Sequence, residues 1–294
     1  MTPPPIKLSI VVAVQHAQSN LPEIVRTLRP ASYPEVEFLF CHTLADPDVP
    51  SLLGDQGNVR ARCSSQGSLI PHLWRDGILA ARGDLVATTT AHCIPDADWV
   101  EKLLSADLDN AARGGAIEGD PEADARSNAI FLLRYAAYAP PLARHDVHEL
   151  AADNAVYRRS DLLRHQDLLQ RGFWEPSFHE RFRAEGIRLE LDPDLKVLHH
   201  NRYSTRQFIA QRLAHGREYG LARAARRPVL QRAILAILAP GAFLVLLGRI
   251  LRIAQRKPQL RSQLMAGGFW LAVFAFAWVA GEASGYCMSL RRRQ

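Results

Sequence analysis

The sequence has few cysteines and no apolar leader at its start. The four cysteines of this 294-residue chain are scattered without Cys-x-x-Cys spacing, so we expect reduced thiols in a cytoplasmic domain and no zinc knuckle. The opening MTPPPIK lacks the apolar segment of a secretory signal, so the N-terminal domain is expected to stay in the cytoplasm. The length allows one large core or two modest ones, which excludes a disulfide-stapled miniprotein.

Acidic residues are almost missing from the C-terminal third. Residues 200–294 hold 16 of the 36 lysines and arginines, but only Glu218 and Glu282 among the 30 acidic residues. Such a basic segment favours a polyanionic partner, either nucleic acid or anionic lipid headgroups. Two apolar runs within it, 233–248 and 265–281, favour the membrane, and no nucleic-acid motif is present. We therefore expect a membrane partner and no nucleic acid.

The two apolar runs are short for membrane spans, since a perpendicular crossing needs about 20 apolar residues. We expect helices over about 230–252 and 264–286, which form a transmembrane hairpin with both ends in the cytoplasm. This predicts a multi-pass protein of the cell membrane, with a domain over 1–222 and a basic membrane-associated region over 223–294. Shallow interfacial or re-entrant helices are the alternative, because arginines in the connecting loop weaken a positive-inside pattern.

Short apolar strands alternate with amphipathic helices in the N-terminal part. This order predicts an α/β domain with a mostly parallel sheet, whose ligands bind beyond the carboxyl ends of the strands. The expected strands are 7–14, 35–40, 58–63 and 85–90, and the expected helices are 21–28, 72–83 and one after Pro95. Farther on, a strand that leads into a helix is expected over 152–163, and amphipathic helices over 178–186 and from 207 onward.

The most informative stretch is 83–104, GDLVATTTAHCIPDADWVEKLL, where a buried strand runs into a polar cluster and then a helix start with Pro and Trp. It resembles the family 2 glycosyltransferases, and similar segments cover most of residues 7–220. The resemblance implies the GT-A fold, which is Rossmann-like, and a nucleotide-sugar donor such as a UDP- or GDP-sugar. In that family an Asp-x-Asp motif at this strand end holds a divalent metal, Mg²⁺ or Mn²⁺, on the donor diphosphate.

Both carboxylates of that motif are missing here, where Thr90, Ala91 and His92 stand. Three interpretations are open. His92 binds a softer metal together with His199 or His200, or His92 and nearby arginines stabilise the diphosphate without a metal, or the domain has lost its activity. An isolated histidine at a strand end can also be a hydrogen-bonded structural residue.

The resemblance also implies positions that contact the donor. Val14 and Gln15 follow the first strand, and His42 stands where the family usually carries acidic residues that touch the uridine. Arg75 and Asp76 match the family's Arg-Asn-x-Gly helix, and Arg75 is the candidate for a phosphate or base contact. The expected donor-binding set is Val14, Gln15, His42, Arg75, Asp76, Thr90 and His92.

Catalytic and acceptor positions are implied in the same way. Glu175 matches the first carboxylate of the family's Glu-Asp pair, whereas Pro176 replaces the second, so Glu175 is the candidate base for the acceptor hydroxyl. His179, one helical turn later, is expected to orient Glu175 or to substitute for it. The expected acceptor-side residues are Asp153, Asn154 and Trp174.

These features predict an inverting transferase that moves a sugar to a lipid, glycolipid or other membrane-proximal acceptor, for a cell-envelope glycan. The Gln-x-x-Arg-Trp motif of processive relatives is absent, so polymer synthesis is not expected. The alternative is a catalytically degenerate relative that binds a nucleotide sugar or a partner protein at the membrane.

Overall fold

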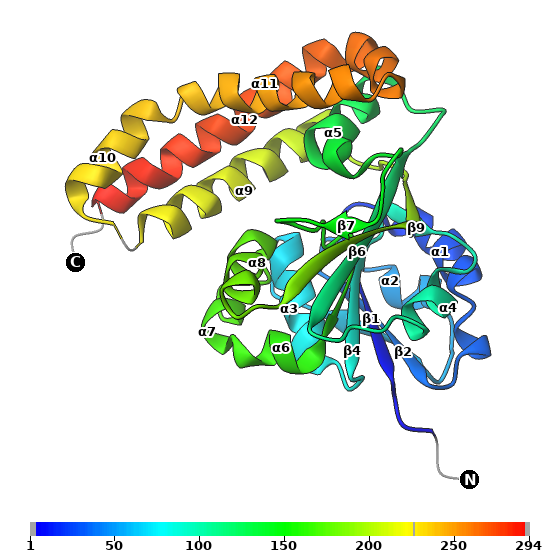
Figure 1. Ribbon diagram of the computed structural model, residues 1–294. Helices are drawn as coiled ribbons and strands as arrows, with labels where there is room; N and C mark the ends of the chain where they lie inside the picture. The colour runs from blue at the N-terminus through cyan, green and yellow to red at the C-terminus, as the bar shows by residue number, and fades with distance from the viewer. Residues whose placement is uncertain (1–3, 226, 292–294) are drawn as a thin grey trace. The chain divides into compact units, whose positions relative to one another are not determined.

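The chain forms two compact units in a computed structural model that describes residues 4–225 and 227–291 (Figure 1). The first unit comprises Met1–Asp120 and Tyr138–Arg202, and the second comprises Pro121–Ala137 and Tyr203–Gln294. The division at Arg202 lies earlier than the boundary expected at residue 222. The second unit also takes in a helix from the middle of the chain.

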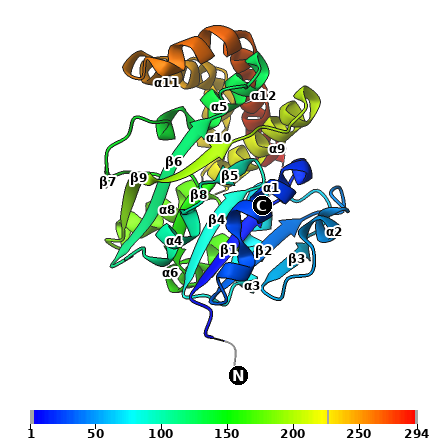
Figure 2. The same ribbon diagram turned by 90° about the vertical axis from the view of Figure 1, so that its right-hand side faces the viewer.

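The first unit is built on a mixed sheet with the strand order β3-β2-β1-β4-β8-β6-β9-β5, and β7 pairs with β9 (Figure 2). Parallel pairing joins β3, β2, β1 and β4, as the sequence predicts, whereas β8 runs antiparallel between β4 and β6. Strands β6 and β9 are also parallel, but β5 and β7 pair antiparallel with β9, so the sheet is mixed where a mostly parallel one was expected. The strands are β1 (Leu8–Ala13), β2 (Val36–His42), β3 (Val59–Cys63), β4 (Leu85–Thr90), β5 (Cys93–Pro95), β6 (Ala111–Gly119), β7 (His145–Asp146), β8 (Asn154–Arg158) and β9 (Arg188–His199).

The strands β1 and β2 are buried along their whole length, as apolar β-branched runs in a covered sheet should be. Gly77 lets the helix α3 lie directly on them, because a Cβ there would be 2.2 Å from Cγ1 of Val11. The helices of this unit are α1 (Leu21–Leu28), α2 (Val49–Leu53), α3 (Ile70–Ala80), α4 (Trp99–Leu104), α6 (Arg159–Arg164), α7 (Gln166–Leu169) and α8 (Glu175–Ala184).

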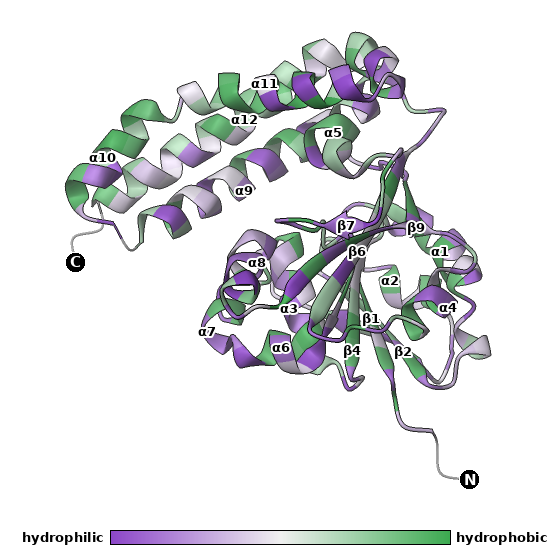
Figure 3. Cartoon of the chain, in the orientation of Figure 1, coloured by the Kyte–Doolittle hydropathy of each residue, from purple (hydrophilic) through white to green (hydrophobic). Residues whose placement is uncertain are grey.

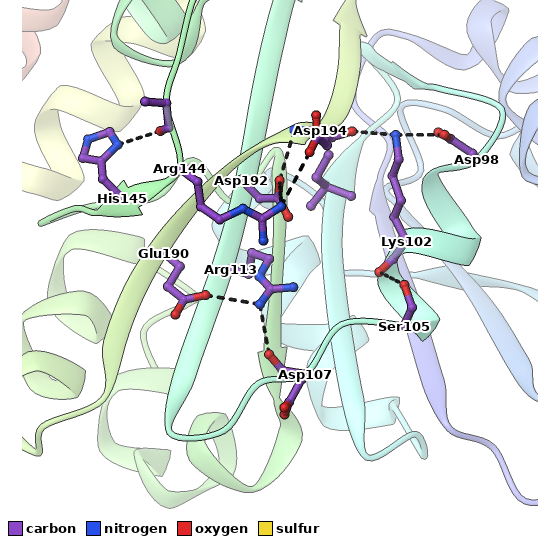
Figure 4. A network of polar contacts seen from close by, with 12 residues as sticks. Asp98, Lys102, Ser105, Asp107, Arg113, Arg144, His145, Glu190, Asp192 and Asp194 are labelled. Atoms are coloured by element: carbon purple, nitrogen blue, oxygen red, sulfur yellow. Dashed lines mark hydrogen bonds and ion pairs between the residues drawn. The ribbon is translucent and has the colours of Figure 1, made fainter.

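A network of charged side chains fixes the irregular strand β9 against β6 and α4 (Figure 4). The pairing of β6 with β9 shifts register after Gly115, where β9 bulges. Nζ of Lys102 on α4 donates to the main-chain oxygen of Asp194 in this bulge at 2.7 Å. On β6, Nη2 of Arg113 donates to a carboxylate oxygen of Glu190 at 3.2 Å. These contacts hold the first half of β9 and its bulge in place.

The second unit consists of helices, in which α9 and α12 approach each other at glycines. A Cβ on Gly216 would lie 2.2 Å from the main-chain oxygen of Trp278, and one on Gly281 would lie 2.3 Å from that of Leu213. Gly220 and Gly285 continue the same close packing of two backbones. The helices are α5 (Ala125–Tyr135), α9 (Thr205–Ala224), α10 (Val229–Leu238), α11 (Gly241–Arg256) and α12 (Gln259–Arg291).

The first predicted apolar helix, over 230–252, is broken into α10 and α11, which meet at 58°. Pro240 stands at the break, where its missing N–H and its ring interrupt a continuous helix. Only α12, over Gln259–Leu290, is a single described helix long and apolar enough to cross a membrane. One such helix is weak evidence for a membrane span, so the transmembrane hairpin stays a prediction.

Candidate functional site

Polar residues gather at one edge of the sheet, where the parallel strands β1 to β4 end and the reversed strand β8 begins. Pairing places Ala13 beside Thr90 and Thr89 beside Asn154. Across this edge, Oγ1 of Thr90 donates to Oδ1 of Asp153 at 3.1 Å. The carboxyl end of β9 also lies here, since His199 pairs with Cys93 just beyond β4. The sheet therefore brings most of the expected donor-side residues to one edge.

Asp46 is a buried carboxylate at this edge that the sequence analysis did not single out. Its Oδ1 accepts the main-chain N–H of His16 at 3.1 Å, whereas its Oδ2 has no hydrogen-bond partner among the described residues. Burial raises the pKa of Asp46, and the N–H and charge of His16, followed by the charge of His42, partly oppose this. A buried acceptor with one open oxygen suits a ligand that brings an N–H group, such as a nucleobase.

The surroundings of Asp46 show how the chain builds this position. His16 adopts a left-handed conformation with φ of 58°, so the main chain turns sharply and directs its N–H to the carboxylate. His42 ends β2, and its main-chain oxygen accepts the N–H of Ser64 at 2.7 Å. The hydroxyl of Ser64 is buried and has no partner in the described part of the chain. An acidic residue four positions after the strand end is the sequence signal that was missed.

His92 is fully buried, and both of its ring nitrogens contact the main chain. Nε2 lies 3.0 Å from the main-chain oxygen of Gln15, and Nδ1 accepts the N–H of Arg202 at 3.2 Å. One nitrogen donates and the other accepts, which is the pattern of a neutral imidazole protonated on Nε2. Both ring nitrogens of His92 are used to join the segment after β1 to the segment after β9. This geometry does not fit the expected contact of His92 with a metal or a diphosphate.

The three histidines considered as metal ligands do not form a ligand set. The rings of His92 and His199 lie 6.4 Å apart between centroids, and Nε2 of His200 lies 3.7 Å from a carboxylate oxygen of Asp120. Over residues 4–225 and 227–291, no group of three or more His, Cys, Asp or Glu residues could hold a metal ion. The residues present at the strand ends therefore do not fit the divalent metal that the resemblance implies.

Asn20 joins the same segments from the other side. It precedes α1, but its side chain makes no capping bond, contrary to what its position suggests. Instead, Nδ2 donates to the main-chain oxygens of Ala91 at 2.9 Å and His200 at 3.1 Å, and Oδ1 accepts from Nε of Arg202 at 2.6 Å. Arg202, which is exposed and was not expected in the site, is therefore held in a defined position.

Glu175 and Trp174 lie at the start of α8, and both are partly exposed. Nε1 of Trp174 donates to the main-chain oxygen of Arg171 at 2.9 Å. Burial raises the pKa of Tyr157 well above its usual value, and the charges of Glu175, Tyr138 and Asp153 raise it further.

His179 lies in the core and not at a surface open to substrate. Its Nδ1 accepts the N–H of Leu150 at 3.4 Å, and its Nε2 pairs with the hydroxyl of Tyr157 at 3.1 Å. Burial, together with the charge of Arg183, lowers the pKa of His179 to about 3. The imidazole is therefore neutral at physiological pH, and this environment does not fit a role in orienting or replacing Glu175.

Asn154, expected on the acceptor side, is also used by the fold. Its Nδ2 donates to the main-chain oxygens of Ala116 and Leu195, both at 2.9 Å, and its Oδ1 accepts from Nε1 of Trp99 at 2.9 Å. These bonds satisfy carbonyls at the irregular pairing of β6 with β9. A structural role explains this buried asparagine completely.

The other residues expected to contact the donor differ in their exposure and in their hydrogen-bond partners. Arg75 and Asp76 pair with each other on α3, with Nη2 of Arg75 2.7 Å from Oδ1 of Asp76. Val14 is buried, and its N–H donates to the oxygen of Cys41 at 2.8 Å, which extends the pairing of β1 and β2. Gln15 is partly exposed at the strand end, and its side chain donates to the oxygen of Ser68 at 3.3 Å.

Comparison with solved structures identifies the fold. A mannosyltransferase from Pyrobaculum calidifontis, in complex with GDP-Man and Mn²⁺, matches with a TM-score of 0.52 and 16% identity over 95% of this chain and 87% of that chain. A mycobacterial protein matches with a TM-score of 0.47 and 14% identity over 72% of this chain and 73% of that chain. No family model and no curated protein sequence matches. The match to the mannosyltransferase shows that the mixed α/β unit, with helices around a sheet, has the fold of a glycosyltransferase.

Proposed function

We propose that this protein is a glycosyltransferase that uses a nucleotide-sugar donor, a UDP- or GDP-sugar. The observation that supports this most is the open, buried carboxylate oxygen of Asp46 at the strand ends of a glycosyltransferase fold. An N–H of the nucleobase bonded to that oxygen would satisfy it, and Ser64 offers a second unpartnered polar atom nearby in the sheet. The sugar then lies toward the ends of β4 and β8.

Glu175 is the proposed base of an inverting, non-processive transfer. As the acceptor oxygen attacks C1 of the sugar, Glu175 takes the hydroxyl proton. The bond from C1 to the diphosphate oxygen breaks on the opposite face, and its electron pair leaves with the diphosphate. Trp174 and Asp153 are the proposed acceptor-side residues, because Trp174 precedes Glu175 in the chain and Asp153 accepts a hydrogen bond from Thr90 at the strand ends.

The proposed acceptor is a lipid or glycolipid at the cytoplasmic face of the cell membrane. Apolar residues cover much of α10, α11 and α12, as Figure 3 shows by colour. Arg249, Arg252 and Arg256 stand exposed on α11, where anionic headgroups would attract them. The exposed large apolar side chains of α10 and α11 are Val229, Leu230, Ile234, Ile237, Leu238, Leu244, Val245 and Leu251. The bend between α10 and α11 suits helices in the membrane interface as well as a broken span.

Transfer from radiolabelled UDP- and GDP-sugars to membrane lipids tests the proposal. Glu175→Gln should lower the rate by about 10²–10⁴-fold, the usual contribution of a positioned base. Glu180→Gln, at an exposed position of the same helix, is the matched control and should leave the rate unchanged. Transfer by Glu175→Gln at the wild-type rate would remove Glu175 from the mechanism.

A catalytically inactive relative that binds a nucleotide sugar or a partner protein at the membrane is the second candidate. The absence of acidic residues at 90–92 favours it. Calorimetry with each nucleotide sugar, run beside the transfer assay, separates the two candidates. Tight binding of a donor without transfer or hydrolysis would favour the inactive relative.

A further inference from the structure

We infer that Arg202 is the fixed cation that faces the donor diphosphate, in the place where a bound metal ion would otherwise balance its charge. This inference rests on the proposed nucleotide-sugar donor. It starts from a chemical need: when the bond from C1 to oxygen breaks, the electron pair stays on the diphosphate, whose negative charge must be stabilised. The strand-end residues that precede Cys93 supply no such charge, because His92 is neutral and Thr90 and Ala91 are uncharged.

The main chain of Arg202 is attached directly to this strand end. Its N–H donates to Nδ1 of His92 at 3.2 Å, and the main-chain N–H of His200 donates to the oxygen of His92 at 2.7 Å. The imidazole thus does not contact the ligand but positions the residue that does. His200 faces Asp120 at 3.7 Å, so it is not the cation left open to an anion.

The side chain of Arg202 is oriented by one further bond. Its Nε donates to Oδ1 of Asn20 at 2.6 Å, and Asn20 is itself fixed by two main-chain oxygens. The side chain is exposed, and no carboxylate of the described residues pairs with its two terminal nitrogens. A guanidinium held through Nε keeps its plane, and its terminal nitrogens can donate side by side to two phosphate oxygens.

A chain of bonded groups joins Arg202 to Asp46, the proposed contact of the nucleobase. Asp46 accepts from the N–H of His16, and the oxygen of the preceding residue, Gln15, contacts His92, which holds Arg202. The oxygen of Gln15 and the N–H of His16 belong to one peptide group, so one peptide group and one imidazole separate the Asp46 carboxylate from the main-chain N–H of Arg202. Asp46 and Arg202 therefore lie within reach of one extended ligand, with its nucleobase at the Asp46 carboxylate and its diphosphate at the Arg202 guanidinium.

Calorimetry on the full chain tests this with GDP and UDP as the diphosphates and guanosine and uridine as the nucleosides, all in excess EDTA. The wild-type protein should bind a diphosphate without metal. Arg202→Ala should weaken diphosphate binding by about 10–100-fold, the usual effect of losing hydrogen bonds to a charged group, and should leave nucleoside binding unchanged. Arg202→Lys should lie in between, because an ammonium keeps the charge but not the paired donors.

Arg26→Ala is the matched control, because Arg26 is an exposed arginine on α1 whose Nη2 lies 3.8 Å from Glu23. Nucleoside affinity reports whether each variant is folded. If Arg202→Ala loses it, Arg202→Gln, which keeps an amide donor for Asn20, supplies the same comparison. Unchanged diphosphate affinity in these variants, or a wild-type protein that binds diphosphate only with Mn²⁺, overturns the inference alone. A wild-type protein that binds neither nucleoside nor diphosphate overturns the proposed function as well.

Discussion

Replacing Asp46 with asparagine should weaken ligand binding and stabilise the fold at the same time. Asp46→Asn keeps the size of the side chain and one oxygen for the N–H of His16. It replaces the partnerless Oδ2 with an NH₂ group, which cannot accept a hydrogen bond from a nucleobase. A hydrogen bond to a charged acceptor contributes about 1.5–3 kcal/mol, so nucleoside affinity should fall by about 10–150-fold.

The stability of the same variant should change in the opposite direction. Burial raises the pKa of Asp46, so the folded protein holds the ionised carboxylate less well than the unfolded chain does. The resulting loss of stability is absent below the unfolded pKa, near 3.9, and grows as the pH rises toward the folded pKa. Asp46→Asn removes this loss, and should therefore be more stable than the wild-type protein at pH 7 but not at pH 3.5.

Calorimetry with uridine and guanosine, and thermal unfolding at the two pH values, measure both effects. Asp48→Asn provides the control, because Asp48 is exposed two residues later and should change neither quantity. The reasoning about Asp46 would be refuted by a variant that binds nucleoside as well as the wild type does. It would equally be refuted by a variant that is less stable at pH 7.

Two further predictions concern the core and the helical unit. Burial lowers the pKa of His179 to about 3, so below about pH 6.5 the unfolded chain binds a proton at this residue and the folded chain does not. The free energy of unfolding should therefore fall by up to about 1.4 kcal/mol for each pH unit in this range. His179→Gln should flatten this part of the pH profile of unfolding, and an unchanged profile would contradict the buried, neutral imidazole. Gly216→Val should separate α9 from α12 and lower stability by at least about 1–3 kcal/mol, because a Cβ would lie 2.2 Å from the oxygen of Trp278. Gly248→Ala, inside α11 where a Cβ meets nothing within 4 Å, should melt at or above the wild-type temperature. Equal melting of both variants would show that α9 and α12 are not in close contact.

The strands of the first unit could be predicted from the sequence because their signal is local. The runs at 7–14, 35–40 and 85–90 are rich in apolar or β-branched residues, 58–63 is a more polar run, and each matches an observed strand within about two residues. The reversed direction of β8 could not be predicted in this way, because strand direction depends on neighbours far away in the chain. The break between α10 and α11 did have a local signal, the Pro-Gly pair at 240–241.

The sequence predicted where the candidate site lies, but not which hydrogen bonds its residues make. Residues that follow a parallel strand reach the same sheet edge whatever their identity, so Gln15, His42 and Thr90 were expected there. His92 bonds residues 77 and 110 positions away, and Asn20 bonds one 182 positions away. Such contacts depend on how distant loops meet, and no spacing in the sequence encodes them. The shift of His92 from expected ligand to structural bridge follows from these distant contacts.

The helix α5 has a consequence for how the protein is made and how it can be divided. It leaves the ribosome before most of the first unit's C-terminal half, yet its partner α12 is the last helix to be synthesised. Its residues that pack against α12, Ala125 and Ala129 beside Gly267 among them, stay uncovered until then, open to a chaperone or a lipid surface. A fragment cut after Arg202 would keep α5 without its cover. A soluble catalytic fragment therefore needs 121–137 replaced by a short polar loop, and not only the removal of the C-terminal helices.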